Sequence, residues 1–420
     1  MTRNILVFLV ITFSNTCFAQ TFVSTTAENK KALLEFFTGY NAFYEPDGHV
    51  MANTIKSNHP NEFFQVLIHT GGFAQPSGPG TDYNTQFGSA IAAQSNLSGY
   101  PSGSVNRHVF PGLGQTGGST AMSRSNWQSA TSQILSESSP VNIGIQSTVD
   151  ISTMTLTVNV EIFYTGPQSI ASNKLNIAVL QHNVEGPQAG GTTFNPSAVL
   201  PNGNYNHQNM LRHLITGQWG DDITNITPGS FISQTYTWSI PSQISGYPLS
   251  PIIDPLNLSV VAFICEGQQE VLTVTEVYPT VIFPNNHDVV LNSIHVNDVI
   301  CSDTVNFEIS FKNYGSQNLT YFDINHTVNQ SSSQWDSWTG NLAPGQSATM
   351  SLSNTNFNAN ATNSLDVSLY MPNNTNDQNP NNNALSENFD HQLSLGNVST
   401  GHIGGQCSFD ITTDQYGSET

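Results

Sequence analysis

Residues 38–49 decide the fold of the first part of the chain, and they read Thr38-Gly39-Tyr40-Asn41-Ala42-Phe43-Tyr44-Glu45-Pro46-Asp47-Gly48-His49. A compact apolar run of strand character, Lys31–Phe37, comes directly before them. The end of the stretch reads as a helix that continues to Ile55, with a proline near its first turn. A second apolar run, Phe63–His69, suits a buried parallel strand, and Thr85–Leu97 suits a second helix. This order predicts a βαβ unit followed by another helix.

A proline stands immediately ahead of the next predicted short strand. It is Pro101, within the segment Ser98–Arg107. In thioredoxin-like folds a proline at this point is cis and lies beside the two cysteines that carry out the redox chemistry. We therefore predict a cis Tyr100–Pro101 peptide bond, which is informative because only a small minority of X–Pro bonds are cis.

Two motifs carry a resemblance to a known family. TGYNAFYEPDGH resembles the TG-x-x-C-x-x-C-P-x-G-H segment of the Omp-28-related outer membrane protein family, thioredoxin-like proteins of bacteria that use type IX secretion. Tyr205–Arg212, followed by Gly217–Gly220, is similar to that family's YNHNHVLR and G-x-WG signature. The motifs stand in matching order, and the resemblance covers roughly residues 26–284. It implies a thioredoxin-like N-terminal domain.

The chain departs from the family at the redox pair itself. A gap-free alignment leaves Ala42 and Glu45 at the two cysteine positions. Thiol–disulfide exchange needs a low-pKa thiolate and a second thiol, and neither a methyl group nor a carboxylate forms the required bonds. The mature chain has three cysteines, all far downstream of these positions: Cys265, Cys301 and Cys407. We predict a redox-degenerate domain that uses no cofactor.

The first nineteen residues read as a signal peptide. Arg3 gives a positive start, Ile5–Phe13 an apolar stretch, and Cys17-Phe18-Ala19 a small-x-small cleavage site. A lipoprotein would instead be acylated at Cys17, but the preceding Ser14-Asn15-Thr16 lacks the leucine of a lipobox. No other stretch reaches the roughly 18 apolar residues that a spanning helix needs. We expect an exported protein that is outer membrane-associated, on the cell surface or extracellular.

Composition predicts a β-rich protein and excludes some partners. Charged residues make up only 9% of the chain, and the net charge of −20 reflects nine Lys and Arg against 29 Asp and Glu. Without a basic stripe, nucleic acid and anionic lipid headgroups are excluded as partners.

Three domains are predicted: a thioredoxin-like α/β domain at 26–139 and two all-β Ig-like sandwiches at 141–282 and 287–392. In the second domain, alternating runs at Val141–Asp150 and Met154–Thr165 predict a hairpin. Further strands of this domain are expected at Leu175–Gln181, Phe231–Ser239, Leu258–Glu266 and Glu270–Tyr278.

The third domain resembles a CARDB type of bacterial Ig-like adhesion module, through the string FEISFKNYGSQNLT…INHTVN…WTGNLAPGQSATMSL. Its strands are expected at Asp288–Ile294, Val305–Lys312, Leu319–Val328, Ser347–Leu352 and Ser364–Tyr370, with residues 338–346 as a link. Residues 393–420 form a tail whose end resembles the first strand of a further, truncated module. No type IX sorting domain is visible in it.

Several side chains suggest binding sites, and each has a structural interpretation beside it. Tyr205, His207 and Trp219, with His213, suggest a metal or sugar site, but the two histidines stand six residues apart and no carboxylate or thiol lies at metal-ligand spacing. A capped helix with His207 in a structural hydrogen bond is the interpretation we prefer, and we predict no metal. His49 is expected on a helix surface. The loop 373–383 has oxygen ligands suited to calcium but one carboxylate, so a solvated turn is favoured.

Three cysteines remain in the mature chain, so at most one intrachain disulfide forms. Cys301 and Cys407 are the preferred pair, because both flank the third domain and export favours oxidation. Cys265, inside an apolar run, is predicted to be a buried thiol.

These features predict a non-enzymatic binding or structural protein of the cell envelope. One alternative is an enzyme, a thiol–disulfide redox helper that recruits a downstream thiol. Another is a peptide-binding chaperone with a groove beside Tyr100 and Pro101. The protein or peptide partner is not written in the sequence.

Overall fold

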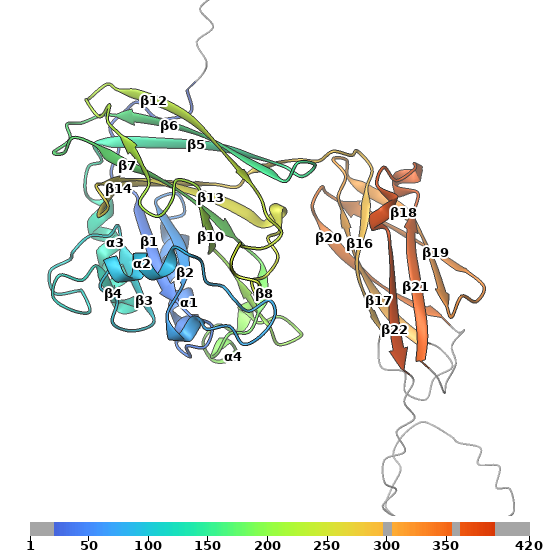
Figure 1. Ribbon diagram of the computed structural model, residues 1–420. Coiled ribbons are helices and arrows are strands. Elements are labelled where there is room, and N and C mark those ends of the chain that lie inside the picture. The colour runs from blue at the N-terminus through green and yellow to red at the C-terminus, as the bar shows by residue number, and fades with distance from the viewer. Residues whose placement is uncertain (1–20, 297–304, 355–361, 391–420) are drawn as a thin grey trace, which may run out of the picture. The chain divides into compact units, whose positions relative to one another are not determined.

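The structure is a computed structural model that describes residues 21–296, 305–354 and 362–390. It divides into two compact units, Met1–Val281 and Ile282–Thr420 (Figure 1). Strands dominate both units, so the predicted β-rich character is confirmed. The signal peptide, the Cys301–Cys407 pair and the tail all fall outside the described residues.

The first unit opens with the βαβ order that the sequence predicted. Its elements are β1 (Ala32–Thr38), α1 (Glu45–Asn58) and β2 (Phe63–His69). β1 and β2 are parallel, in a register that joins Thr38 to His69. β1 also pairs antiparallel with β3 (Ser102–Val105), which continues to β4 (Ala121–Ser123) and α3 (Trp127–Leu135). The Tyr100–Pro101 peptide bond ahead of β3 is cis, the configuration expected from the sequence.

Both faces of β1 and β2 are buried, which explains why these strands read as continuous apolar runs. On one face, Leu34 and Phe36 pack with Trp127 of α3 and with α1. On the other face, Leu33 and Phe37 join a second core built from later strands. Strands of a sheet alternate their side chains between faces, so one strand contributes to two cores.

The sheet does not stop where the sequence predicted a domain boundary. It has nine strands, ordered β14-β13-β7-β10-β2-β1-β3-β4, with β11 paired to β7. The added strands are β7 (Asn173–Gln181), β10 (Met210–Leu214), β11 (Asp221–Ile223), β13 (Leu258–Glu266) and β14 (Glu270–Val277). Here the structure differs from the predicted independent sandwich at 141–282: its main sheet continues the sheet of residues 26–139.

A second sheet covers part of the first and completes a two-layer arrangement. Its order is β12-β6-β5-β15. The strands are β5 (Val141–Asp150), β6 (Thr155–Tyr164), β12 (Phe231–Ser239) and β15 (Thr280–Ile282), and β5 packs on β13 and β14. The predicted β5–β6 hairpin is confirmed.

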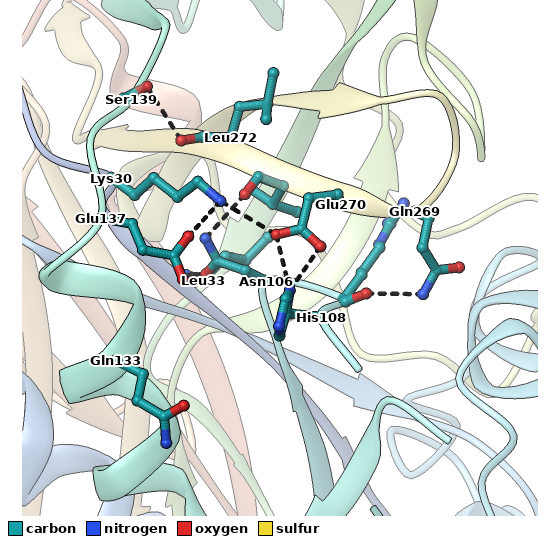
Figure 2. A network of polar contacts seen from close by, with 12 residues as sticks. Lys30, Leu33, Asn106, His108, Gln133, Glu137, Ser139, Gln269, Glu270 and Leu272 are labelled. Carbon is teal, nitrogen blue, oxygen red and sulfur yellow. Dashed lines mark hydrogen bonds and ion pairs between the residues drawn. The ribbon is translucent and has the colours of Figure 1, made fainter. Parts of the chain in front are cut away.

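Polar contacts join the two predicted segments of the first unit (Figure 2). Lys30 Nζ lies 2.8 Å from the Glu137 carboxylate and 3.2 Å from that of Glu270, which also contacts His108 at 2.9 Å. Ser139 Oγ donates to the Leu272 carbonyl at 3.2 Å. These contacts tie β14 to the N-terminal segment, so a hinge at residues 139–141 is not expected.

Shorter elements connect these strands. They are α2 (Gly88–Gln94), β8 (Val184–Gly186), α4 (Gly191–Phe194) and β9 (Tyr205–His207). The capped helix predicted around His207 is wrong, because this segment forms β9 and β10. Met210 pairs with Gln181 of β7 and with Leu67 of β2, and pairing on both sides fixes the segment as a strand.

The second unit is a sandwich of two antiparallel sheets. One sheet holds β16 (Val289–Val296), β17 (Val305–Asn313) and β20 (Ser347–Asn354). The other has the order β19-β18-β21-β22, with β18 (Leu319–Val328), β19 (Gln334–Leu342), β21 (Thr362–Tyr370) and β22 (Ala384–Asp390). Their inner faces share one apolar core that includes Phe307, Phe311 and Phe322.

Within the three described ranges, no helix combines the length and the apolar character needed to cross a membrane.

Candidate functional site

The two degenerate redox positions lie in one turn at the N-terminus of α1. Ala42 accepts a hydrogen bond from the Glu45 backbone N–H at 3.4 Å, and Glu45 is the first residue of the helix. Gly39 opens this turn against the backbone of residue 73: a Cβ on Gly39 would lie 2.5 Å from the Phe73 carbonyl carbon. The loop therefore packs closely on residue 73 and carries no thiol.

Cys265 is the one cysteine within the described residues, and it lies elsewhere, on β13. It is a free, buried thiol, as predicted. Burial raises the pKa of Cys265 to about 12, although the Arg107 guanidinium opposes that shift. Such a thiol is inert as a nucleophile near neutral pH.

Glu45 places a carboxyl group where the second cysteine of the family pattern stands, and this side chain is fully buried. Neither of its oxygens has a hydrogen-bond partner. Burial raises the pKa of Glu45 well above its ordinary value; Thr38 and Arg124 act in the opposite direction but close no hydrogen bond to it. The protonated, uncharged form is thereby favoured in the folded protein.

His49 is buried one helical turn after Glu45, so its predicted place on the helix surface is wrong. Its Nδ1 lies 2.8 Å from the Tyr205 hydroxyl, which accepts a hydrogen bond from the Asn195 amide at 2.7 Å. Because the amide already donates to this oxygen, the hydroxyl proton is available to His49. The contact joins α1 to β9, which sequence reasoning could not bring together.

His69 and His207 extend this buried polar cluster. Their ring centroids are 5.8 Å apart, and each packs on Tyr83 at 4.9 Å. His207 Nε2 donates to the Pro187 carbonyl at 3.2 Å, which bears out the structural hydrogen bond predicted for it. Both ring nitrogens of His69, Nδ1 of His207 and Nε2 of His49 have no partner.

Burial keeps these three imidazoles neutral. It lowers the pKa of His49 to about 3 and that of His207 to about 4, and the neighbouring histidines reinforce burial in lowering the pKa of His69 well below its ordinary value. In the described part of the chain, no group of three or more His, Cys, Asp or Glu side chains has the arrangement of a metal site. A cavity of about 40 Å³ beside His49 and Tyr205 is lined mainly by side-chain amides, and it suits two or three water molecules.

Trp219, which the sequence grouped with Tyr205 and His207, lies in the loop between β10 and β11. Among the described residues it makes no ring contact with either of them. His213 faces away from the cluster and stacks on Trp238, with ring centroids 4.9 Å apart and planes 10° from parallel. The structure therefore brings together Tyr205 and His207, and leaves Trp219 and His213 out.

Aromatic side chains surround the degenerate loop, three of them exposed and two half-buried. We call them the aromatic rim: Phe43, Tyr44 and Phe73 are exposed, and Tyr100 and Phe194 are half-buried. Phe43, Tyr44 and Phe73 are 50%, 53% and 47% exposed. Phe43 and Tyr44 each lie 5.3 Å from Phe194, and Phe73 lies 5.6 Å from Tyr100. Only Tyr100 was singled out from the sequence, because the approach of residues 73 and 194 to this loop depends on the fold.

The chain is similar to several known proteins. Three solved structures match the chain at low sequence identity. HBP35 of Porphyromonas gingivalis is 14% identical, covers 86% of this chain and 98% of its own, and has a TM-score of 0.46. A domain of the outer membrane lipoprotein Omp28 from Porphyromonas gingivalis is 17% identical over 34% of this chain and 90% of its own, with a TM-score of 0.22. The CARDB domain of PF1109 from Pyrococcus furiosus, in complex with di-metal ions, is 18% identical over 25% of this chain and 87% of its own, with a TM-score of 0.21.

Among the curated proteins, none matches the sequence. The family model described as outer membrane protein Omp28 matches residues 88–282, which include the Tyr205–Arg212 motif and strands β5 to β15. Over these residues the chain is similar to the Omp28 outer membrane protein family.

Proposed function

We propose that the chain is an exported, non-enzymatic binding protein associated with the outer membrane, and that its aromatic rim binds extended, apolar segments of other proteins. The observation that carries the proposal is the exposure of Phe43, Tyr44 and Phe73 around a loop without thiols. The Omp28 match supports the association with the outer membrane.

The N-terminal segment serves, in this proposal, as a thioredoxin-like scaffold that has lost its chemistry. The order β1-α1-β2-α2-β3-β4-α3 and the parallel β1–β2 pair support this assignment. A disulfide exchanger presents a groove to extended substrates next to its reactive pair. In this proposal the aromatic rim serves as the binding surface, and Ala42 and Glu45 replace the pair.

The rim's chemistry suits an apolar or basic segment. Large aromatic side chains left in water mark interaction sites when they are grouped. The charged pair nearest the rim, Arg124 and Asp47, is already engaged, and the Arg124 guanidinium lies 5.8 Å from the Tyr44 ring. With a net charge of −20, the chain repels acidic segments.

A binding measurement with an unfolded protein tests this proposal. The probe is fluorescein-labelled lysozyme, a basic protein, that has been reduced and carboxamidomethylated so that its cysteines carry no added charge, titrated with the mature chain. We expect binding that weakens about thirtyfold in the double variant Phe43→Ala/Tyr44→Ala and about fivefold in Phe73→Ala, since each aromatic contact contributes on the order of 1 kcal/mol.

Phe231→Ala is the matched control, because Phe231 is 43% exposed but lies on β12, outside the rim. It should bind the probe as the parent chain does. Failure to bind, or equal losses in Phe231→Ala and in the rim variants, would refute the proposal.

The redox-helper alternative is tested by insulin reduction with dithiothreitol as donor. We expect no turnover above the uncatalysed rate, because Cys265 is buried and residues 42 and 45 carry no sulfur. The double variant Ala42→Cys/Glu45→Cys should form a disulfide, detectable by mass spectrometry of non-reduced peptides, because both residues lie in one turn. Catalysis by the parent chain would restore the enzymatic reading, and failure of the new cysteines to pair would contradict the scaffold.

A further inference from the structure

The outer face of the second unit's larger sheet carries two neighbouring aromatic side chains, Trp335 of β19 and Tyr370 of β21. They are 60% and 45% exposed, although both lie on a regular strand. Their ring centroids are 5.5 Å apart and the planes are inclined by 44°. We call this pair the aromatic platform. The inner face of the same sheet holds Phe322 and Leu369 in the core, so the platform is not needed to fill the sandwich.

Hydrogen-bonding side chains lie under the platform. Trp335 and Ser368 are both register partners of Asn325 on the intervening strand β18. Tyr370 is the register partner of Asp323 on the same strand. An amide, a hydroxyl and a carboxylate are therefore within reach of a ligand that stacks on the rings.

A groove adjoins Tyr370 at the end of β21. Its volume is about 430 Å³, within the usual range of ligand pockets, and it is lined by Ser368, Met371, Asn376, Asp377 and Asn383 among others. Asn383 is 95% buried: its amide donates to the Leu369 carbonyl at 3.1 Å, while its Oδ1 has no hydrogen-bond partner. The polar side chains of the groove that a ligand can reach are those of Ser368, Asn376 and Asp377.

The charge of the second unit limits the class of ligand that the aromatic platform can bind. Residues 282–420 contain one basic side chain apart from histidine, Lys312, against thirteen Asp and Glu. Lys312 belongs to β17, in the other sheet. Uronate-containing and sulfated polymers, nucleic acid and acidic peptides would meet acidic groups with no cation to offset them.

We infer that the platform and its groove bind a neutral polysaccharide. A sugar ring offers weakly positive C–H groups on one face, which pack on the negative face of an aromatic ring, and it offers hydroxyl groups at its rim that donate to amide and carboxylate oxygens. Two rings and an adjoining groove match a chain of several sugars. A peptide that extended the sheet would pair with the backbone of an edge strand, β19 or β22, whereas the ligand inferred here stacks on side chains that project from the face of the sheet. The inference does not rest on the function proposed for the aromatic rim.

Affinity electrophoresis of the mature chain tests the inference. Native gels are cast with a mixed-linkage β-glucan, a xylan, a mannan, a soluble starch or, as the acidic probe, a polygalacturonate. We expect retardation in at least one neutral gel and none with polygalacturonate. Trp335→Ala and Tyr370→Ala should each weaken the binding about tenfold, the loss of one aromatic contact of about 1.4 kcal/mol.

Two variants control this measurement. Trp335→Phe keeps an aromatic face and should retain most of the retardation. Tyr278→Ala removes a side chain that is 63% exposed in the first unit, and it should bind as the parent does. Unchanged unfolding curves would show that the platform variants remain folded.

The inference is overturned if no neutral polysaccharide retards the chain, or if retardation persists in both Trp335→Ala and Tyr370→Ala. Binding of a lysine-rich peptide that depends on Trp335, without any polysaccharide binding, would also overturn it and would assign the face to a basic peptide.

Discussion

At the start of α1, single residues replace thiol chemistry with buried acid–base groups. A carboxyl group fills the place of a thiol at Glu45, and His49 packs one turn later against Tyr205. Burial shifts the pKa of the acid upward and the pKa of His49, His69 and His207 downward. All four side chains are thereby favoured in their uncharged forms.

These shifts predict opposite pH dependences for the free energy of unfolding. A lowered histidine pKa contributes stability that is present above pH 6.5 and is lost as pH falls toward about 4 for His207 and about 3 for His49. The raised pKa of Glu45 contributes stability that is present below about pH 4.5 and is lost as pH rises through the folded-state pKa. The histidines therefore cause acid unfolding, and Glu45 causes loss of stability toward neutral pH.

Glu45→Gln separates the two effects. Between pH 4 and pH 7, we expect the free energy of unfolding of Glu45→Gln to rise by about 1–3 kcal/mol relative to that of the parent. The reason is that the glutamine side chain does not ionise in the unfolded chain. Urea unfolding at pH 4, 5.5 and 7 measures this difference. Glu62→Gln, at a largely exposed carboxylate, is the control. A stability difference between Glu45→Gln and the parent that does not change with pH would contradict the prediction.

At the scale of elements, the side chain of Asn106 links β1 to β14 through hydrogen bonds. Asn106 follows β3 with a φ of 49°, a conformation that asparagine tolerates better than most residues. Its Oδ1 accepts from the Leu33 N–H at 2.7 Å, and its amide donates to the carbonyls of Lys31 and Val271 at 3.1 and 3.0 Å. Figure 2 shows Asn106 between β1 and β14, where it binds both.

Asn106→Ala should therefore destabilise the whole first unit. We expect a loss of about 3–5 kcal/mol, since it removes three buried hydrogen bonds and forces alanine to a positive φ. Asn96→Ala is a matched control, because Asn96 also has a positive φ, of 53°, but is exposed. Chemical denaturation followed by circular dichroism measures both. Equal losses in the two variants would show that the backbone conformation alone accounts for the effect.

Strands with a regular apolar pattern could be predicted from the sequence, whereas elements defined by pairing with distant strands could not. β5, β12, β13 and β18 have the predicted bounds, because alternation or a continuous apolar run marks them. β19 was missed: of its nine residues only Leu342 is buried, so no apolar alternation marks it. The segment around His207 was read as a helix because its pairing with β2 and β7 cannot be seen locally.

For the whole molecule, the arrangement in two units predicts where proteases cut. A broad-specificity protease such as subtilisin suits the test, because the chain has only nine Lys and Arg. We expect early cleavage between β15 and β16, at about residues 283–287, where one unit ends and the next begins. Residues 138–140 should resist, because Ser139 is buried and bonded to Leu272.

Mass spectrometry of the fragments checks this prediction. Two products should persist, one ending near residue 282 and one beginning near residue 287. Early cleavage at residues 138–141 would mean that the first unit is two domains, as the sequence suggested.

The sequence alone determined the local features of this protein. It placed Ala42 and Glu45 at the redox positions, because spacing to Pro46 and Gly48 is a local property. It predicted the β-rich composition, the βαβ order and the buried Cys265, because hydrophobic periodicity and apolar runs report burial directly.

Only the tertiary structure decided how distant segments meet. Residues 141–282 extend the N-terminal sheet because β10 pairs with β2, a contact between residues more than 140 positions apart. The same pairing brings His207 and Tyr205 to His49, and folding of the second unit brings Trp335 beside Tyr370. Such contacts follow from packing and strand order in three dimensions, which the pattern within any one segment does not encode.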